Sequence, residues 1–267
     1  MTTPPRSCRL PLSFNAVELL SEVERLSPRI WTPHFNAEYH NGGWMGVALR
    51  NGDGNSARLY VNPADDRATR DTAVLADCPR LNNALNAFAC PLRGARLLRL
   101  APGGVIELHR DPDLIFEAGQ ARLHVPLTTN PGVEFYVDGE RIIMSPGECW
   151  YLDLSRLHRV VNRGASDRIH LVIDAVVNDW LRAQINAGAV PDVIAAAPTG
   201  ATEFDRFREM VFADAAVAET LRGKTDAAAF VDLCVEWGIA YGCRFAPEDV
   251  RAAMARGREQ WVSQWIV

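Results

Sequence analysis

The stretch ARLLRLAPGGVIELHRD, residues 95–111, sets the pattern for the rest of the chain. Its two apolar runs, 95–100 and 105–109, have the composition of strands and are separated by the turn-forming Pro102-Gly103-Gly104. Side chains on a strand alternate between its two faces, so His109 and Asp111 point in the same direction. The end of the second predicted strand therefore presents an imidazole and a carboxylate to one point in space.

Strand-like segments of similar length follow at close, regular spacing. The most distinct pair is Val133 to Val137 and Glu140 to Met144, because Asp138-Gly139 between two apolar runs favours a tight hairpin turn. The other predicted strands are 122–127, 148–154 and 168–176. Many short strands with turn residues between them indicate a mainly β fold, a double-stranded β-helix of the jelly-roll, cupin-like type.

The N-terminal part mixes α and β elements. The predicted strands are 9–14 and 44–50, and the predicted helices are 16–26 and 79–88. Asn15 is expected to cap the first helix, and its apolar residues at helical spacing are expected to form a buried face: Val17, Leu20, Val23 and Leu26. The stretch 55–76 is polar and of mixed charge, and it predicts no clear element.

The character of the sequence changes after Trp180. The segment 190–200 is rich in alanine, proline and glycine, and the residues after it have apolar stripes at helical spacing. We therefore expect one domain over 1–185 with its jelly-roll core at 95–180, a linker over 186–201, and a small all-helical domain over 202–267.

Composition limits the classes of protein. With 267 residues, 48% of them hydrophobic, the chain can bury a sizeable core. A net charge of −5 argues against a nucleic-acid partner or an anionic membrane surface. The six cysteines show no CxxC spacing, and no apolar run has the length of a signal peptide or of a membrane-spanning helix. We expect a soluble, cytoplasmic protein with reduced thiols.

A second histidine and an arginine complete the chemistry of this block. His158 follows the run of strands, and Arg168 comes ten residues later. Two imidazoles and one carboxylate form the facial triad that holds non-haem Fe(II) and leaves positions open for other ligands. His109, Asp111 and His158 are therefore called the candidate triad, and Arg168 would pair with the far carboxylate of a cosubstrate. Asp113 competes with Asp111 as the carboxylate ligand, although it lies beyond a proline, and its alternative role is that of a solvated loop acid.

The block 95–180, about a third of the chain, resembles the bacterial aspartyl/asparaginyl β-hydroxylase family, which includes free-amino-acid hydroxylases such as the proline cis-4-hydroxylases. Besides the stretch quoted first, three segments carry the resemblance: ARLHVPLTTNP (121–131), SPGECWYLDLSRLHRVVN (145–162) and DRIHLVIDAVVNDW (167–180). The resemblance implies a double-stranded β-helix enzyme that uses Fe(II), 2-oxoglutarate and O2.

The resemblance also implies a role for each residue at the site. The candidate triad would be the catalytic iron ligands, and Arg168 and His124 would bind 2-oxoglutarate. Arg122 lies where a contact to a substrate carboxylate is expected, but it could instead form an ion pair with Glu134 or Asp174.

Three further features of the block stay open. His124 could be a core histidine that is hydrogen-bonded to a neighbour. His170 shares the strand face of Arg168 and could approach the pocket, or it could be a satisfied core histidine. The aromatic stretch from Trp31 to Trp44 could fold over the mouth of the barrel as a lid.

The implied activity is hydroxylation of an sp3 C–H of a free amino acid or of an aspartyl or asparaginyl residue, with release of succinate and CO2. Two other classes stay open, namely a cupin-type metal enzyme that does not use 2-oxoglutarate and a non-catalytic peptide-binding protein. Arg168 favours the oxygenase over the cupin, which has no need of a pocket-facing arginine at that position.

The C-terminal part has a looser resemblance of its own. The segments FREMVFADAAVAETL (207–221) and DAAAFVDLCVEWGIAYGCRFAPEDVRAAM (226–254) resemble the leader-peptide-like helical family associated with nitrogen-fixation operons and natural-product precursor peptides. This likeness rests mainly on an apolar pattern and one Gly-x-x-Phe turn. It implies an interaction module that links the enzyme to a peptide or protein partner.

Overall fold

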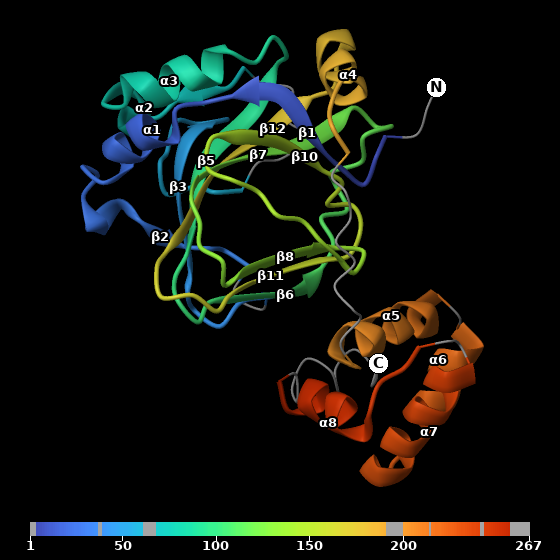
Figure 1. Ribbon diagram of the computed structural model, residues 1–267. Helices are drawn as coiled ribbons and strands as arrows, with labels where there is room; N and C mark the ends of the chain where they lie inside the picture. The colour runs from blue at the N-terminus through green and yellow to red at the C-terminus, as the bar shows by residue number, and fades with distance from the viewer. Residues whose placement is uncertain are drawn as a thin grey trace. The chain divides into compact units, whose positions relative to one another are not determined.

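The structure is a computed structural model that describes residues 4–36, 39–60, 68–190, 200–213, 215–240 and 243–256. It divides into two compact units, residues 1–194 and 195–267, and each is described by itself. The first unit contains two β-sheets that face each other and helices that cover one of them, and the second is helical (Figure 1).

The larger sheet of the first unit has eight antiparallel strands in the order β1-β10-β7-β12-β5-β3-β2, with β4 paired to β3. Their bounds are β1 Ser7–Ser13, β2 Thr32–Pro33, β3 Trp44–Asn51, β4 Arg70–Asp71, β5 Leu92–Leu100, β7 Gln120–Thr128, β10 Glu148–Leu152 and β12 Arg168–Val176. The central strands β7, β12 and β5 are nine residues long and are buried on both faces. This accounts for their nearly continuous apolar sequences.

The smaller sheet has four strands in the order β6-β11-β8-β9. Their bounds are β6 Val105–His109, β8 Val133–Val137, β9 Glu140–Arg141 and β11 His158–Asn162. Asp138 and Gly139 join β8 to β9 with φ angles of +49° and +76°, as a two-residue hairpin turn requires. The predicted hairpin is therefore confirmed, although β9 ends at Arg141 rather than at Met144.

Helices cover the outer face of the larger sheet (Figure 1). Their bounds are α1 Ala16–Val23, the 3-10 helix η1 Pro28–Ile30, α2 Ala73–Ala76, α3 Pro79–Asn86 and α4 Asp179–Asn186. Asn15 caps α1, as expected, but the predicted apolar face was wrong at Val17, whose side chain is 78% exposed. The helix instead buries Leu19, Glu22 and Val23, because the Glu22 carboxylate accepts hydrogen bonds from the first backbone N–H groups of α3. Neither α2 nor α4 was predicted from the sequence.

A second apolar layer lies between the two sheets. It joins residues of the larger sheet, such as Leu98 and Val172, to residues of the smaller sheet, such as Phe135 and Val160. Two facing antiparallel sheets around this interior make the unit a mainly β, double-stranded β-helix of the jelly-roll type, which confirms the predicted fold class.

The second unit contains α5 Gly200–Ala213, α6 Ala215–Arg222, α7 Ala227–Ala240 and α8 Pro247–Arg256 around its own apolar core. Its core includes Phe204, Phe207 and Phe230, and the Asp249 carboxylate accepts from the backbone N–H of Ala246 at the start of α8. A role for this unit as an interaction module stays a prediction.

The predicted linker over residues 186–201 is described only in part. Ala189 is still hydrogen-bonded to Arg9 of β1, and most of the predicted linker, residues 191–199, lies outside the described residues.

All six cysteines are buried free thiols. In the described part of the chain, every helix is too short or too polar to cross a membrane. A cytoplasmic location stays a prediction.

Candidate functional site

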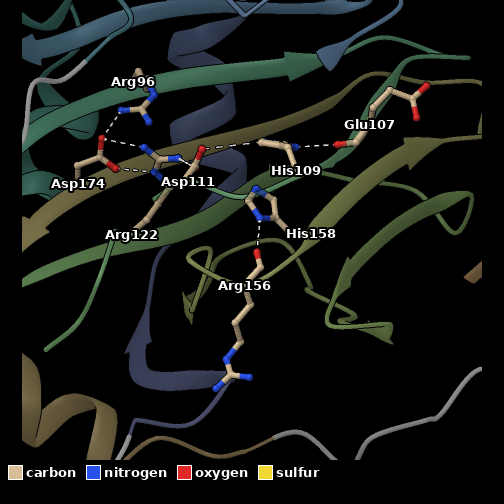
Figure 2. Close-up of polar contacts among 8 residues, drawn as sticks. All are labelled: Arg96, Glu107, His109, Asp111, Arg122, Arg156, His158 and Asp174. Carbon is tan, nitrogen blue, oxygen red and sulfur yellow. Dashed lines mark hydrogen bonds and ion pairs between the residues drawn. The ribbon is translucent and has the colours of Figure 1, made fainter. Parts of the chain in front are cut away.

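The two histidines of the candidate triad are cross-strand neighbours. His109 ends β6 and His158 begins β11, and the two residues are paired in register with ring centroids 4.2 Å apart. The Nδ1 atom of His109 donates to the backbone oxygen of Glu107 at 2.7 Å, and that of His158 donates to the backbone oxygen of Arg156 at 2.9 Å (Figure 2). Each Nε2 atom is therefore the one left with a lone pair for a metal.

Burial keeps these two histidines neutral. It is the main reason that the pKa of His158 falls to about 3, and it also lowers the pKa of His109. A histidine must be neutral to bind a metal ion. The pair therefore meets this condition at neutral pH.

Asp111 completes the cluster from the loop that follows β6. Its backbone N–H donates to the oxygen of Leu154 at 2.9 Å, and its Oδ1 atom lies 3.9 Å from the Nε2 atom of His109. One ligand atom from each member of the candidate triad lies within 4.8 Å of the others. The competing acid Asp113 is exposed and is not part of this cluster.

A buried network of charges supports Asp111 (Figure 2). Arg122 donates from Nε to Asp174 at 2.6 Å, and another of its nitrogens donates to the Oδ2 atom of Asp111. Arg96 donates to the other oxygen of Asp174 at 2.7 Å. Burial would raise the pKa of Asp174, but the two guanidinium groups lower it far below its ordinary value. Of the two acids considered as partners of Arg122, the structure shows Asp174, while Glu134 pairs with Arg163.

The arrangement around Arg122 gives a prediction for metal binding. The bond from Arg122 occupies one oxygen of Asp111 and leaves the other facing the histidine nitrogens, so Arg122→Leu should free the carboxylate to rotate. We expect a loss of Mn(II) affinity of about 10- to 100-fold, as is usual when a group that orients a ligand is removed. Titration calorimetry measures this affinity. Arg163→Leu, which removes an arginine paired with Glu134 outside the candidate triad, is the control and should leave the affinity unchanged.

A second polar group lies on the larger sheet. Arg168 and His170 project from β12 and His124 projects from β7, all into the interior between the sheets. Arg168 is only 1% exposed, and its guanidinium donates to the Nδ1 atom of His170 at 2.8 Å. The Nδ1 atom of His124 lies 3.2 Å from the same nitrogen. Within the described residues, no acidic side chain pairs with Arg168, and burial alone lowers its pKa to about 9.

A cavity of about 270 Å³ opens beside Asp111. Arg96, Arg122 and Asp174 form its charged side, whereas Arg168, His170 and His124 are not part of its wall. The aromatic stretch considered as a lid also contributes to the wall of the cavity. Its residues in the cavity wall are His34, Phe35, Asn36, Tyr39 and Trp44.

Stacking fixes that aromatic wall. The ring of His34 stacks on Trp44 with the planes 10° apart, and Tyr39 stacks on His109 at 4.8 Å. The Asn41 side chain joins this segment to the loop before β6, because it donates to the Gly103 oxygen and accepts from the Val105 N–H.

Sequence reasoning missed one charged residue of the site, Arg96. A signal was present in the stretch quoted first, since alternation places Arg96 on the same face of β5 as the inward-facing Leu98 and Leu100. A charge on the inward face of a core strand has to be paired.

The buried neutral histidines give a prediction for pH dependence. The pKa of His158 is about 3, and burial lowers the pKa values of His124 and His170 well below the ordinary value near 6.5. The unfolded chain therefore binds more protons than the folded protein between about pH 6.5 and pH 3. The stability of the metal-free protein should be complete above about pH 6.5 and should fall within this window by about 1.4 kcal/mol per histidine for each unit that the pH is lowered.

Urea unfolding at pH 7, 6 and 5 in the presence of a chelator measures this effect. His124→Asn should flatten the dependence by the contribution of one histidine. Equal stability at pH 7 and pH 5 would contradict the prediction.

Comparison with known proteins places the chain in a family. The family model described as aspartyl/asparaginyl beta-hydroxylase matches residues 14–177, more than half of the chain, so the chain belongs to this family. L-proline cis-3-hydroxylase 2 of a Streptomyces species is 30% identical over 146 residues, which cover 51% of this chain and 48% of that protein. L-proline cis-4-hydroxylase of Rhizobium meliloti (strain 1021) is 26% identical over 165 residues, which cover 61% and 58%. The chain spans about half the length of the curated relatives it matches.

Solved structures show more distant likenesses. An oxidoreductase of the 2OG-Fe(II) oxygenase family from Burkholderia pseudomallei matches with a TM-score of 0.41 and 13% identity, over 60% of this chain and 77% of that chain. The viral collagen prolyl hydroxylase of Paramecium Bursaria Chlorella virus-1 matches with a TM-score of 0.39 and 14% identity, over 64% and 97%.

Membership of the family implies Fe(II), 2-oxoglutarate and O2, and the residues present fit these groups. The donor set of two neutral imidazoles and one carboxylate is that of a non-haem Fe(II) site. The Nε atom of Arg168 and the Nε2 atom of His124 are buried and have no partner among the described residues, as expected of a site that receives a polar ligand.

Proposed function

We propose that this protein is an Fe(II)- and 2-oxoglutarate-dependent oxygenase that hydroxylates an sp3 C–H of an amino acid and releases succinate and CO2. One observation carries the proposal. The candidate triad lies at the edge of one sheet, and a buried guanidinium without an acidic partner, Arg168, lies on the other. A metal ion and an anionic cosubstrate are the ligands that these two groups are suited to bind.

Each residue then has a role. The metal ion would be held by His109, Asp111 and His158 (Figure 2). Their orientation would be fixed by hydrogen bonds, from His109 to Glu107, from His158 to Arg156 and from Arg122 to Asp111. Arg168 would donate charge-assisted hydrogen bonds to the distal carboxylate of 2-oxoglutarate, with His124 beside it. When bound, Fe(II) together with 2-oxoglutarate and O2 supplies the oxidising chemistry.

The cavity beside Asp111 is the proposed substrate site. Its aromatic wall excludes water from one side, and its charged side contains two guanidinium groups, those of Arg96 and Arg122, that share Asp174. With a divalent metal ion and a dianionic cosubstrate bound, these groups together with Arg168 and Asp111 leave one positive charge in excess, and Arg93, Arg110 and Asp113, which also line the cavity, add another. The α-carboxylate of a free amino acid would pair with this positive charge, whereas the backbone of a peptidyl residue presents only amides and, of the two peptidyl candidates, only an aspartyl side chain supplies a carboxylate.

The names of the relatives support the same choice of substrate. Proteins described as L-proline cis-3- and cis-4-hydroxylases match more than half of this chain. The position hydroxylated depends on which carbon the cavity holds nearest the metal. We propose a free amino acid, proline among them, over a peptidyl residue.

The experiment is succinate formation by protein loaded with Fe(II) under anaerobic conditions and then given 2-oxoglutarate and O2. It is run without substrate, with each of the twenty amino acids, and with blocked peptides that contain aspartate or asparagine. Turnover that rises with one amino acid and stops on chelation of the metal supports the proposal. Turnover that rises only with the peptides would replace the free amino acid by a peptidyl substrate.

The same experiment addresses the two remaining classes. Metal-dependent activity that does not consume 2-oxoglutarate would support the cupin-type enzyme. Absence of 2-oxoglutarate consumption in protein shown to hold Fe(II) would sink the oxygenase proposal and leave the non-catalytic, peptide-binding alternative.

A further inference from the structure

The buried arginines of this site have two kinds of partner. Arg96 and Arg122 donate to Asp174, a carboxylate that neutralises much of their charge. Arg168 is less accessible than either of them, but it donates to the neutral imidazole of His170. Both kinds of partner accept a hydrogen bond, but only the Asp174 carboxylate carries a negative charge.

Hydrogen-bond chemistry fixes the state of this imidazole. A guanidinium has only donors, so the Nδ1 atom of His170 must be the acceptor and the ring proton must lie on Nε2. The Nδ1 atom of His124 lies 3.2 Å from the same nitrogen, whose single lone pair Arg168 already uses. Burial and the neighbouring Arg168 charge lower the pKa of His170, so the ring stays neutral.

A neutral acceptor suits an arginine that is to receive an anion. A carboxylate at position 170 would orient the guanidinium equally well, but it would also neutralise the guanidinium and compete with an incoming carboxylate. An apolar residue would leave the charge uncompensated but also leave the guanidinium without a fixed orientation. His170 supplies orientation alone. The alternation of β12 makes this possible, because residues 168 and 170 lie on the same face of the strand.

We propose that His170 is a positioning residue that holds Arg168 in the orientation that binds the distal carboxylate of 2-oxoglutarate, without neutralising it. This inference rests on the proposed function, since it requires that Arg168 receives that carboxylate. His170 itself does not contact the reacting atoms.

The test compares three substitutions of His170 through their affinity for 2-oxoglutarate. Asn keeps a neutral acceptor near the position of Nδ1, Leu removes the acceptor, and Asp replaces it with a charged one. Affinity is measured by titration calorimetry on protein loaded with Mn(II) in place of Fe(II), so that binding is read without turnover, and melting temperatures report the fold.

We expect His170→Asn to bind 2-oxoglutarate within about threefold of the wild type, and His170→Leu to bind about tenfold or more weakly, because a hydrogen bond to a charged group is lost. His170→Asp should weaken binding by about 100-fold while its melting temperature stays at or above that of the wild type, because the buried charge gains a counterion. Kinetics over a range of 2-oxoglutarate concentrations should show the change in KM rather than in kcat.

The outcomes separate this inference from the proposed function. A wild type that binds no 2-oxoglutarate would overturn the function itself. A wild type that binds it in an Arg168-dependent way, with His170→Asp binding equally well, would overturn the inference alone. If His170→Leu does not fold, the contrast between Asn and Asp still decides, because both keep an acceptor and differ in charge.

Discussion

Arg168→Met is expected to abolish 2-oxoglutarate binding and, in the metal-free protein, to raise the melting temperature. The guanidinium is 1% exposed and no acidic residue pairs with it among the described residues, so the resting fold carries a buried charge that lacks a counterion. Such a charge costs several kcal/mol, and methionine fills a similar volume without it. Loss of the partner for the cosubstrate carboxylate should weaken binding by about 100-fold or more.

Two measurements on the same samples check this pair of effects. Calorimetry with Mn(II)-loaded protein gives the affinity for 2-oxoglutarate, and thermal unfolding of the metal-free protein gives the stability. Arg96→Met is the matched control, because Arg96 is also buried but donates to Asp174. Its removal should lower the melting temperature. If Arg168→Met lowered the melting temperature as much as Arg96→Met does, the charge of Arg168 would be compensated in the metal-free protein, which contradicts the prediction.

Asp174→Asn is expected to have the largest effect on stability. Asp174 is the carboxylate that both Arg96 and Arg122 share, and all its hydrogen bonds run to these two guanidinium groups. The amide keeps the shape but removes the charge, so two arginines would remain at the base of the cavity without a counterion. Breaking a buried pair in this way costs about 3 to 5 kcal/mol. For a unit of this size, the melting temperature should fall by about 10 °C.

Asp167→Asn provides the comparison for that substitution. Asp167 is a partly exposed acid just before β12 whose carboxylate lies 3.8 Å from Arg99, and a solvent-accessible pair of this kind contributes little. Its substitution should leave stability within about 0.5 kcal/mol of the wild type. Urea unfolding of both variants at pH 7 measures the difference. Equal stabilities would mean that the network around Asp174 is solvated rather than buried.

Much of the fold could be predicted from the sequence because its signals are local. Alternation along a strand predicted that His109 and Asp111 point to one place, and they do lie together, although Asp111 belongs to the loop after β6 rather than to the strand. Asp138-Gly139 between apolar runs marked the hairpin that the structure contains. Alternation on β12 likewise grouped Arg168, His170 and Asp174 on one inward face. These features depend on spacings of a few residues.

What could not be predicted depends on pairing between distant segments. The contact of His109 with His158 requires that β6 and β11 pair in one register, which spacing alone does not specify. Val17 has the spacing of a core residue, but α1 is rotated so that Glu22 reaches the start of α3, a contact that no local pattern shows. The same holds for the partner of Arg122, where two acids were considered and strand register selected Asp174.

The polar groups of the interior are divided between the two sheets. His109 and His158 belong to the smaller sheet, whereas His124 and Arg168 belong to the larger one. A cosubstrate bound to the metal at one end and to Arg168 at the other would span the interior between the two sheets. The bound cosubstrate would add a link between the two layers, which otherwise meet through apolar packing and a few hydrogen bonds, such as that from the Asn162 side chain to the Leu100 oxygen. The ligand-bound protein should therefore be more rigid than the free protein.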